Sequence, residues 1–136
     1  MKRFLAVAAL AVLASPAAAQ TVDVGRANWS AMPSLNVTDA DLPMDVLVTA
    51  VEDILKTKQC KLEGQSYQQF DITVPYAVLL EPDGTTSRVV VGEVNCPPIE
   101  TLVGRVALER SNLGHYQPTG LSRARWHADK ISFVLQ

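Results

Sequence analysis

The residues best suited to bind a metal are the two histidines, His115 and His127, and the two cysteines, Cys60 and Cys96. Structural zinc sites in short chains repeat a local spacing of roughly two to five residues between paired ligands. No pair among these four residues has that spacing. We therefore expect neither a metal site nor another cofactor.

A Ser–His–Asp catalytic triad can be assembled on paper from Ser66, His127 and Asp129. Ser66 is not bounded by the two glycines of a nucleophile elbow, which exposes the serine in hydrolases of that class. The carboxylates near the first expected helix, among them Asp45 and Glu52, fit roles in the helix dipole and the solvated face. The sequence therefore predicts no catalytic residues and no enzyme.

A cationic stripe is the third arrangement of residues that could bind a ligand. Arg123, Arg125 and His127 alternate with Ala124 and Trp126, so an extended segment places the three on one face. Such a stripe can receive a carboxylate or an anionic glycan. The alternative is an ordinary solvated face that leads into the last strand.

Cys60 and Cys96 have a second use, because an even cysteine count in an exported chain favours a disulfide. We expect them to join the end of the first helix to the start of the second. The closed loop would stabilise the fold by roughly 3–4 kcal/mol on the chain-entropy account.

The N-terminus has the pattern of a secretory signal peptide. Lys2 and Arg3 precede an apolar run over residues 4–14, and the run ends in Ala17-Ala18-Ala19. The run is shorter than the about 20 residues that a membrane-spanning helix needs. We expect cleavage before Gln20, a periplasmic or secreted product, and no stable membrane insertion after cleavage.

The net charge of −2 becomes more negative without Lys2 and Arg3, so nucleic acid is not an expected partner. Residues 20–40 read as an extended arm or one short strand, and residues 41–136 as a single domain. In that domain Asp39 or Asp41 can cap a helix that starts near Pro43 and ends near Gln59. Its apolar residues recur at helical spacing.

From Phe70 the apolar residues alternate, which predicts a strand, and Pro82-Asp83-Gly84 predicts the turn to a second strand over residues 87–94. Asn95 can cap a second helix that ends near Asn112. Residues 130–136 alternate again, and a short edge strand is expected near Tyr116. The order α-β-β-α-β predicts an α+β fold of two layers, with a small antiparallel sheet packed on two helices.

Several segments resemble the C-terminal domain of TonB-type energy transducers over residues 70–135. They are Tyr76-Ala77-Val78-Leu79-Leu80, the turn Pro82-Asp83-Gly84-Thr85, Arg88-Val89-Val90-Val91, the helix that begins at Cys96-Pro97-Pro98-Ile99-Glu100, Tyr116-Gln117-Pro118, and Ile131-Ser132-Phe133-Val134-Leu135. The resemblance implies a β-β-α-β core that recruits an extended peptide at a sheet edge. The membrane anchor and Pro-rich spacer of the transducers have no counterpart in this sequence.

We expect a protein-binding module whose partner is an envelope protein or peptide added as a strand. The candidate edge is the final strand, Ile131, Ser132, Phe133, Val134 and Leu135, or the short strand near Tyr116. A small envelope enzyme or ligand-binding protein is the alternative, which a concave pocket with converging polar groups would favour. The sequence leaves the partner and the oligomeric state open.

Overall fold

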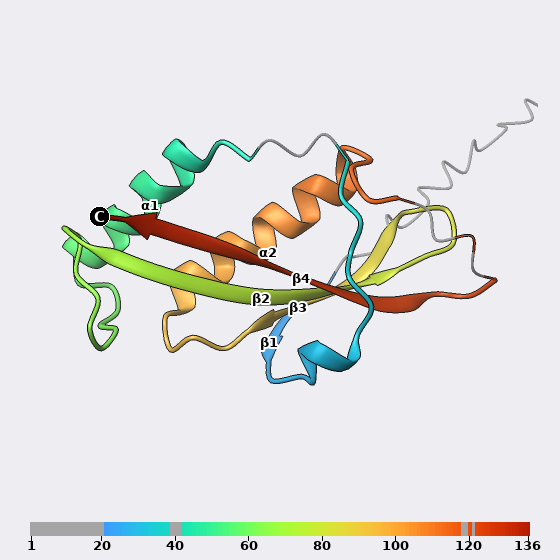
Figure 1. The fold of residues 1–136 in the computed structure, drawn as a ribbon, viewed down its shortest axis with the longest axis horizontal. Coiled ribbons are helices and arrows are strands. Elements are labelled where there is room, and N and C mark those ends of the chain that lie inside the picture. The colour runs from blue at the N-terminus through green and yellow to red at the C-terminus, as the bar shows by residue number, and fades with distance from the viewer. Residues whose placement is uncertain (1–20, 39–41, 118–119, 121) are drawn as a thin grey trace, which may run out of the picture.

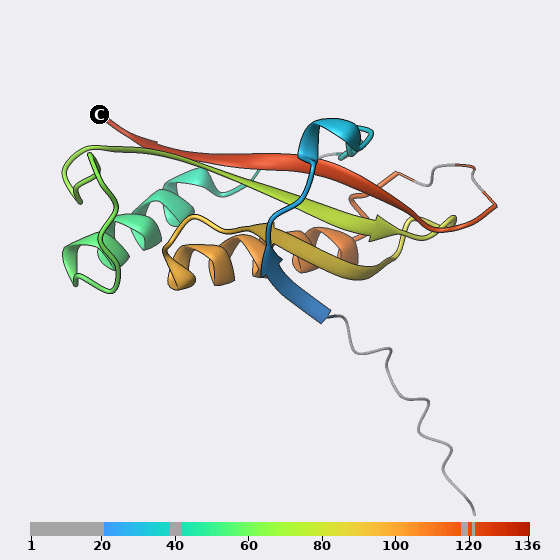
Figure 2. The ribbon, with the colours of Figure 1, turned by 90° about the horizontal axis from the view of Figure 1, so that it is seen from below.

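The computed structural model of the 136-residue chain describes residues 21–38, 42–117, 120 and 122–136. They form two layers, with helices α1 (Met44–Lys56) and α2 (Pro97–Asn112) on one face of a four-stranded sheet. Figure 1 shows the fold, and Figure 2 shows the short helix η1 (Trp29–Ala31) on the other face. The α+β class and the two-layer arrangement expected from the sequence are confirmed.

The sheet has the strand order β1-β3-β2-β4, with β1 at Thr21–Gly25, β2 at Phe70–Leu80, β3 at Thr86–Gly92 and β4 at Arg125–Leu135. Both β3 and β4 run antiparallel to β2, whereas β1 runs parallel to β3. The sheet is therefore mixed and not wholly antiparallel. The prediction missed the parallel pair because β1 lies in the segment 20–40, outside the elements used to predict the sheet.

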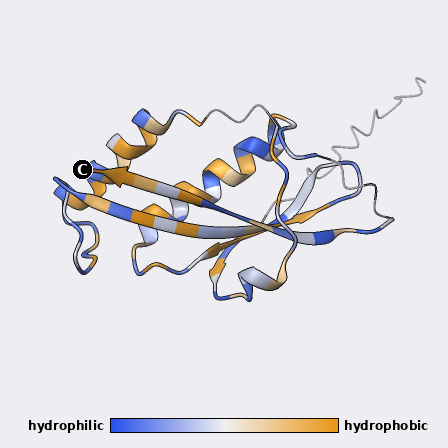
Figure 3. Cartoon of the chain, viewed as in Figure 1, coloured by the Kyte–Doolittle hydropathy of each residue, from blue (hydrophilic) through white to orange (hydrophobic). Residues whose placement is uncertain are grey.

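Alternation along β2 separates the two faces of the sheet. Every second residue from Phe70 to Leu80 is buried toward the helices, and Figure 3 shows the corresponding change of hydropathy along the ribbon. Helix α1 adds a stripe of Leu47, Val51, Ile54 and Leu55 to the same core. The sequence periodicity thus produces one continuous apolar core between the layers.

A proline in the central strand β2 is accommodated by the end of β3. The last β3 residue paired with β2 is Val91, opposite Tyr76, so the ladder to β3 stops just before Pro75. On the other side Pro75 lies opposite Lys130 of β4. A Cβ added to Gly92 would lie 2.6 Å from the Pro75 ring, so glycine is needed for this close approach.

The turn between β2 and β3 has the predicted chemistry. Gly84 has a φ of 90°, a left-handed value that glycine adopts without strain. The Asp83 carboxylate accepts hydrogen bonds from the Thr85 hydroxyl and backbone N–H, at 2.6 and 2.9 Å. These bonds hold the pKa of the Asp83 carboxyl below its ordinary value.

The start of α2 differs from the expectation. Asn95 does not cap the helix: it has a φ of 60°, and Cys96 holds the N-cap position. Pro97 and Pro98 fill the first turn, where their missing N–H groups cost no helical bond. The Glu100 carboxylate instead accepts a 2.8 Å hydrogen bond from the Val94 N–H, which fixes the approach to the helix.

The expected disulfide is present between Cys60 and Cys96, with a Cα–Cα distance of 5.3 Å. It links the segment after α1 to the N-cap of α2, as predicted. The N-cap position of α1 is held by Pro43, so neither of the expected caps, Asp39 and Asp41, occupies it. Asp39, Asp41 and the segment 1–19 lie outside the described residues. Within the described part of the chain, no helix has the length and apolar character needed to cross a membrane.

Candidate functional site

One edge of the sheet is formed by β4. The strand pairs with β2 along its whole length, from Arg125 opposite Leu80 to Leu135 opposite Phe70. No other named strand of the described chain lies on its far side. A strand in this position presents backbone N–H and C=O groups that a further strand can bind.

A short segment of the chain already uses part of this edge. The Ala128 N–H donates to the Pro33 carbonyl at 3.0 Å, and the Leu35 N–H donates to the Ala128 carbonyl at 2.9 Å. These bonds form a parallel bridge between Ser34 and Ala128. The backbone groups of Ala128 therefore point away from β2 and receive an extended segment.

The position of Ala128 fixes the orientation of the rest of β4, because successive backbone groups of a strand alternate in direction. Those of Ser132 and Val134 point outward like Ala128, whereas those of Ile131, Phe133 and Leu135 bond to β2. Of the five residues predicted as an edge, two therefore have backbone groups available to a partner, and three use theirs to bond to β2.

Side-chain burial agrees with this division. Ile131 and Phe133 are buried in the core, Leu135 is partly buried against it, and Ser132 and the 42% accessible Val134 are exposed on the other face. The Ser132 hydroxyl is 2.8 Å from that of Thr73 on β2. At Ser132 and Val134 the edge is therefore a backbone surface with small, uncharged flanking side chains, and the exposed Lys130 lies two residues before it.

The second candidate edge, near Tyr116, is not part of the sheet. Tyr116 makes an isolated antiparallel bridge to Val37 and is buried. Its hydroxyl donates a 2.7 Å hydrogen bond to the Ala107 carbonyl on α2, which draws the ring under the helix. This segment pairs with residues 36–38 and offers no open strand next to β4.

The structure does not assemble the predicted cationic stripe. Arg123 and Arg125 are exposed beside a shallow hollow of about 280 Å³. His127 is buried because it belongs to the helix-facing set of β4 residues, and its Nδ1 lies 3.0 Å from the Arg125 carbonyl oxygen. The exposed part of the stripe is reduced to the two arginines.

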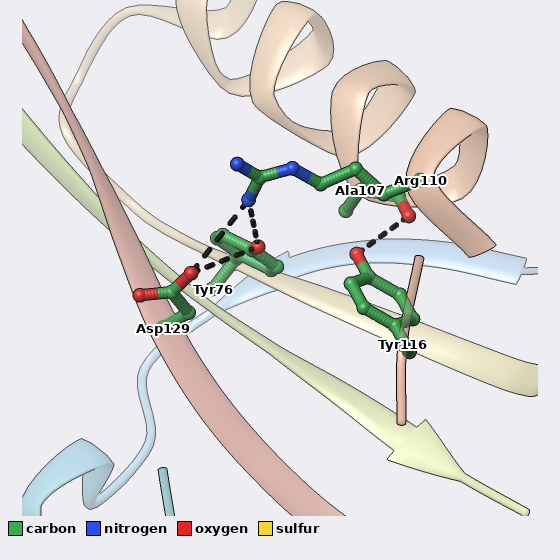
Figure 4. A network of polar contacts seen from close by, with 5 residues as sticks. All are labelled: Tyr76, Ala107, Arg110, Tyr116 and Asp129. Atoms are coloured by element: carbon green, nitrogen blue, oxygen red, sulfur yellow. Dashed lines mark hydrogen bonds and ion pairs between the residues drawn. The ribbon is translucent and has the colours of Figure 1, made fainter. Parts of the chain in front are cut away.

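A network of polar side chains lies between helix α2 and the sheet (Figure 4). Arg110 of α2 donates a 2.8 Å hydrogen bond to the Tyr76 hydroxyl, and that hydroxyl donates to the Asp129 carboxylate at 3.3 Å. Arg110 and Asp129 also form an ion pair at 3.6 Å. The network joins α2 to the two longest strands, and Tyr76 and Asp129 are direct cross-strand partners.

Burial sets the protonation of the two phenols in this region. It raises the pKa of Tyr76, a rise that the Arg110 guanidinium opposes. Burial raises the pKa of Tyr116 even further, and the nearby Tyr76 adds to that rise. Both phenols therefore stay neutral at physiological pH and act as fixed hydrogen-bonding groups.

The network was not predicted from the sequence. The alternation that predicts the β2 and β4 strands also puts Tyr76 and Asp129 on the inward side. A tyrosine and an acid on the inward faces of two strands, together with an arginine on the inward face of α2, form the pattern that could have predicted this network.

Among the described residues, the Ser66–His127–Asp129 triad is not assembled. Ser66 is hydrogen-bonded to Gln69 and lines a hollow that Leu135 also lines. His127 precedes Leu135 by eight residues on β4, which separates these two residues by about 26 Å at 3.3 Å per residue. Cys60 and Cys96 are joined to each other. Within the described ranges, no three His, Cys, Asp or Glu side chains lie close enough to hold a metal.

Two further hollows flank the segment 57–69. One of about 310 Å³ is lined by residues that include Leu55 and Leu62, and one of about 400 Å³ is lined in part by Phe70 and Leu135. Neither is lined by the groups of the Tyr76 network. Comparison with known protein families, curated proteins and solved structures finds no match to this chain.

Proposed function

We propose that the chain is a small exported protein-binding module that recruits an extended segment of an envelope protein along the open edge of β4. The observation that carries the proposal is the outward backbone of Ser132 and Val134, which continues the edge that already binds residues 33–35 at Ala128. Main-chain hydrogen bonds provide affinity in this mode of recognition, and alternate side chains provide specificity.

The direction of the partner follows from the segment already bound. Residues 33–35 run parallel to β4, and the chain then leaves the edge, because Val37 bridges to Tyr116. A partner strand that continues this pairing would lie beside Lys130, Ser132 and Val134. Its side chains would alternate between the exposed face of the sheet and the helix layer.

Export is part of the proposal. It is supported by the charged start, apolar run and alanine-rich end of residues 2–19. The Cys60–Cys96 disulfide fits an oxidising compartment such as the periplasm. A TonB C-terminal-like identity for the part that follows Phe70 rests on the residue pattern given above, and it implies the same mode of peptide capture.

The test blocks the outer edge while leaving the inner ladder intact. The Ser132 N–H points away from β2, so Ser132→Pro removes an edge donor without removing a bond to β2. Ser132→Ala is the matched control, because both changes lose the hydroxyl contact with Thr73. Val134→Pro is a second edge variant with the same outward geometry.

The immobilised protein and its variants are incubated with envelope extract, and the retained proteins are compared. A partner bound along β4 should be retained by the native protein and Ser132→Ala and lost with either proline variant. Circular dichroism and thermal unfolding establish that the proline variants are folded. Retention of every partner by both folded proline variants would contradict the proposal.

A further inference from the structure

The opposite edge of the sheet is occupied by the short strand β1. It pairs in parallel with β3, from Thr21 opposite Arg88 to Gly25 opposite Gly92. Four of its five residues are exposed, including Val22 at 38% and Val24 at 50%. Strands that bury little apolar surface lie at the low-stability end of a structure and open locally.

A notch in α2 lies against the Val22 side chain of β1. Gly104 is buried in the middle of α2, where glycine is unfavourable for a helix. A Cβ added at Gly104 would lie 2.7 Å from Val22 Cγ1 and 3.5 Å from Val91 Cγ2. The missing Cβ therefore leaves the space into which Val22 fits.

The polar contacts of β1 are few and solvated. Asp23 forms a 3.2 Å ion pair with Arg88, and both side chains are about half exposed. Arg26 reaches Glu93 at 3.6 Å from a side chain that is almost fully exposed. Exposed ion pairs of this kind contribute little to stability. Their main effect is therefore on which strand sequence binds to β3, and they add little to the stability of β1 in its place.

We propose that the β3 edge is a strand-acceptor site that β1 occupies reversibly, and that an extended partner peptide of similar pattern displaces β1. The peptide has a β-branched apolar residue for the Gly104 notch, followed directly by a carboxylate that lies opposite Val90 and reaches the Arg88 guanidinium, as Asp23 does. This site lies on the opposite edge of the sheet from β4, so the two are independent. Segment β1 acts as a tethered competitor that keeps the site closed.

The probe is a fluorescent synthetic peptide with the sequence of residues 20–26, and its binding is measured by anisotropy. In the native protein the tethered β1 has an effective concentration on the order of millimolar, so the free peptide binds weakly. Val22→Gly weakens the resident strand and leaves the notch intact. This variant should bind the peptide about fivefold more tightly than the native protein, because β-branched and glycine residues differ by about that factor in strands.

The double variant Val22→Gly with Gly104→Ala is the matched control. Without Val22 Cγ1 the new Cβ meets no resident side chain at that distance, and alanine favours the helix, so the fold is preserved. The incoming valine is then blocked, and binding should return to the native level or below. A peptide with Asp at the position of Val22 should fail to bind Val22→Gly.

Equal peptide binding by the native protein and Val22→Gly would overturn the proposal, as would tight binding to the double variant. Hydrogen exchange gives a second criterion. Native β1 amides should exchange at least a hundredfold faster than those of β2, and equal protection would show a permanent strand. If β1 is exchanged between copies of the protein and no peptide is bound, the site is occupied by a second copy of the chain. That result would also contradict the proposal.

Discussion

Replacing Tyr76 with phenylalanine should destabilise the protein more than any other single tyrosine-to-phenylalanine change. The lost hydroxyl accepts the 2.8 Å hydrogen bond from Arg110, whose side chain is only 11% exposed. The Arg110 Nε is buried without a hydrogen-bond partner among the described residues, so the guanidinium has little left to bind. What remains is the 3.6 Å ion pair with Asp129, whose side chain is 35% exposed.

The expected cost follows from the charge on the donor. Hydrogen bonds to charged groups contribute about 1.5–3 kcal/mol, and water cannot reach this guanidinium freely enough to replace the lost partner. For a domain of this size the melting temperature should fall by roughly 6–12 °C. The phenyl ring still fills the same space, so no cavity adds to this value.

Urea unfolding of three variants separates this effect from a general loss of a hydroxyl. Tyr116→Phe removes a neutral 2.7 Å bond to the Ala107 carbonyl and should cost about 0.5–1.5 kcal/mol. Tyr67→Phe changes an exposed residue and should cost less than about 0.5 kcal/mol. Adding Arg110→Met to Tyr76→Phe removes the orphaned charge and should recover part of the loss. A cost for Tyr76→Phe no larger than that for Tyr67→Phe would refute the reasoning.

Three further predictions concern stability. Removing the disulfide with Cys60→Ala and Cys96→Ala should cost about 4 kcal/mol, because the bond closes a separation of 36 residues; denaturant midpoints measure this, and a cost below about 1 kcal/mol would contradict it. Burial raises the pKa of Tyr76 and Tyr116 above the unfolded value of about 10, so the contribution of these two phenols to stability should be constant below that pH and fall above it, by up to about 1.4 kcal/mol per pH unit for each phenol. Unfolding at pH 9–11.5 tests this, Tyr116→Phe should reduce the slope, and native-state absorbance showing ionisation of both phenols near pH 10 would contradict it. Gly92→Ala should cost about 1–3 kcal/mol through the contact with the Pro75 ring, and Pro75→Ala should relieve most of that cost; equal stability of Gly92→Ala and the native protein would exclude the clash.

The elements predicted best are those with long, regular patterns. The alternation through Phe70 and Ile72 and the Pro82-Asp83-Gly84 turn define the β2–β3 hairpin without reference to the rest of the chain. The two helices follow from apolar periodicity and from prolines at their starts, Pro43 at the N-cap of α1 and Pro97 and Pro98 in the first turn of α2. The disulfide follows from an even cysteine count and from the placement of both residues near helix ends.

The elements missed are those that depend on distant partners. Strand β1 has five residues, too few for a reliable period, and it forms only because β3 and Gly104 provide its ladder and its notch. The start of β4 carries His127 and Asp129 inward, against the hydrophobic pattern of a core strand. Asp129 is tolerated there because Tyr76 and Arg110 reach it from elsewhere in the sequence.

The candidate site shows the same limit at the level of single residues. The sequence identified the final strand, but not which of its residues present the edge. That depends on the β2–β4 register and on the bonds from Ala128 to residues 33–35. The cationic stripe was predicted by alternation alone, which ignores that one face of β4 is covered by helices and buries His127.

Residue-resolved hydrogen exchange along β4 tests the central proposal most directly. In the free protein the amides of Ser132 and Val134 should exchange rapidly, whereas those of Ile131, Phe133 and Leu135 should be protected by β2. When a partner captured through the Ser132-dependent edge is bound, Ser132 and Val134 should become protected by at least tenfold. Protection of both amides in the free monomer, or no change in either when that partner binds, would contradict strand addition at β4.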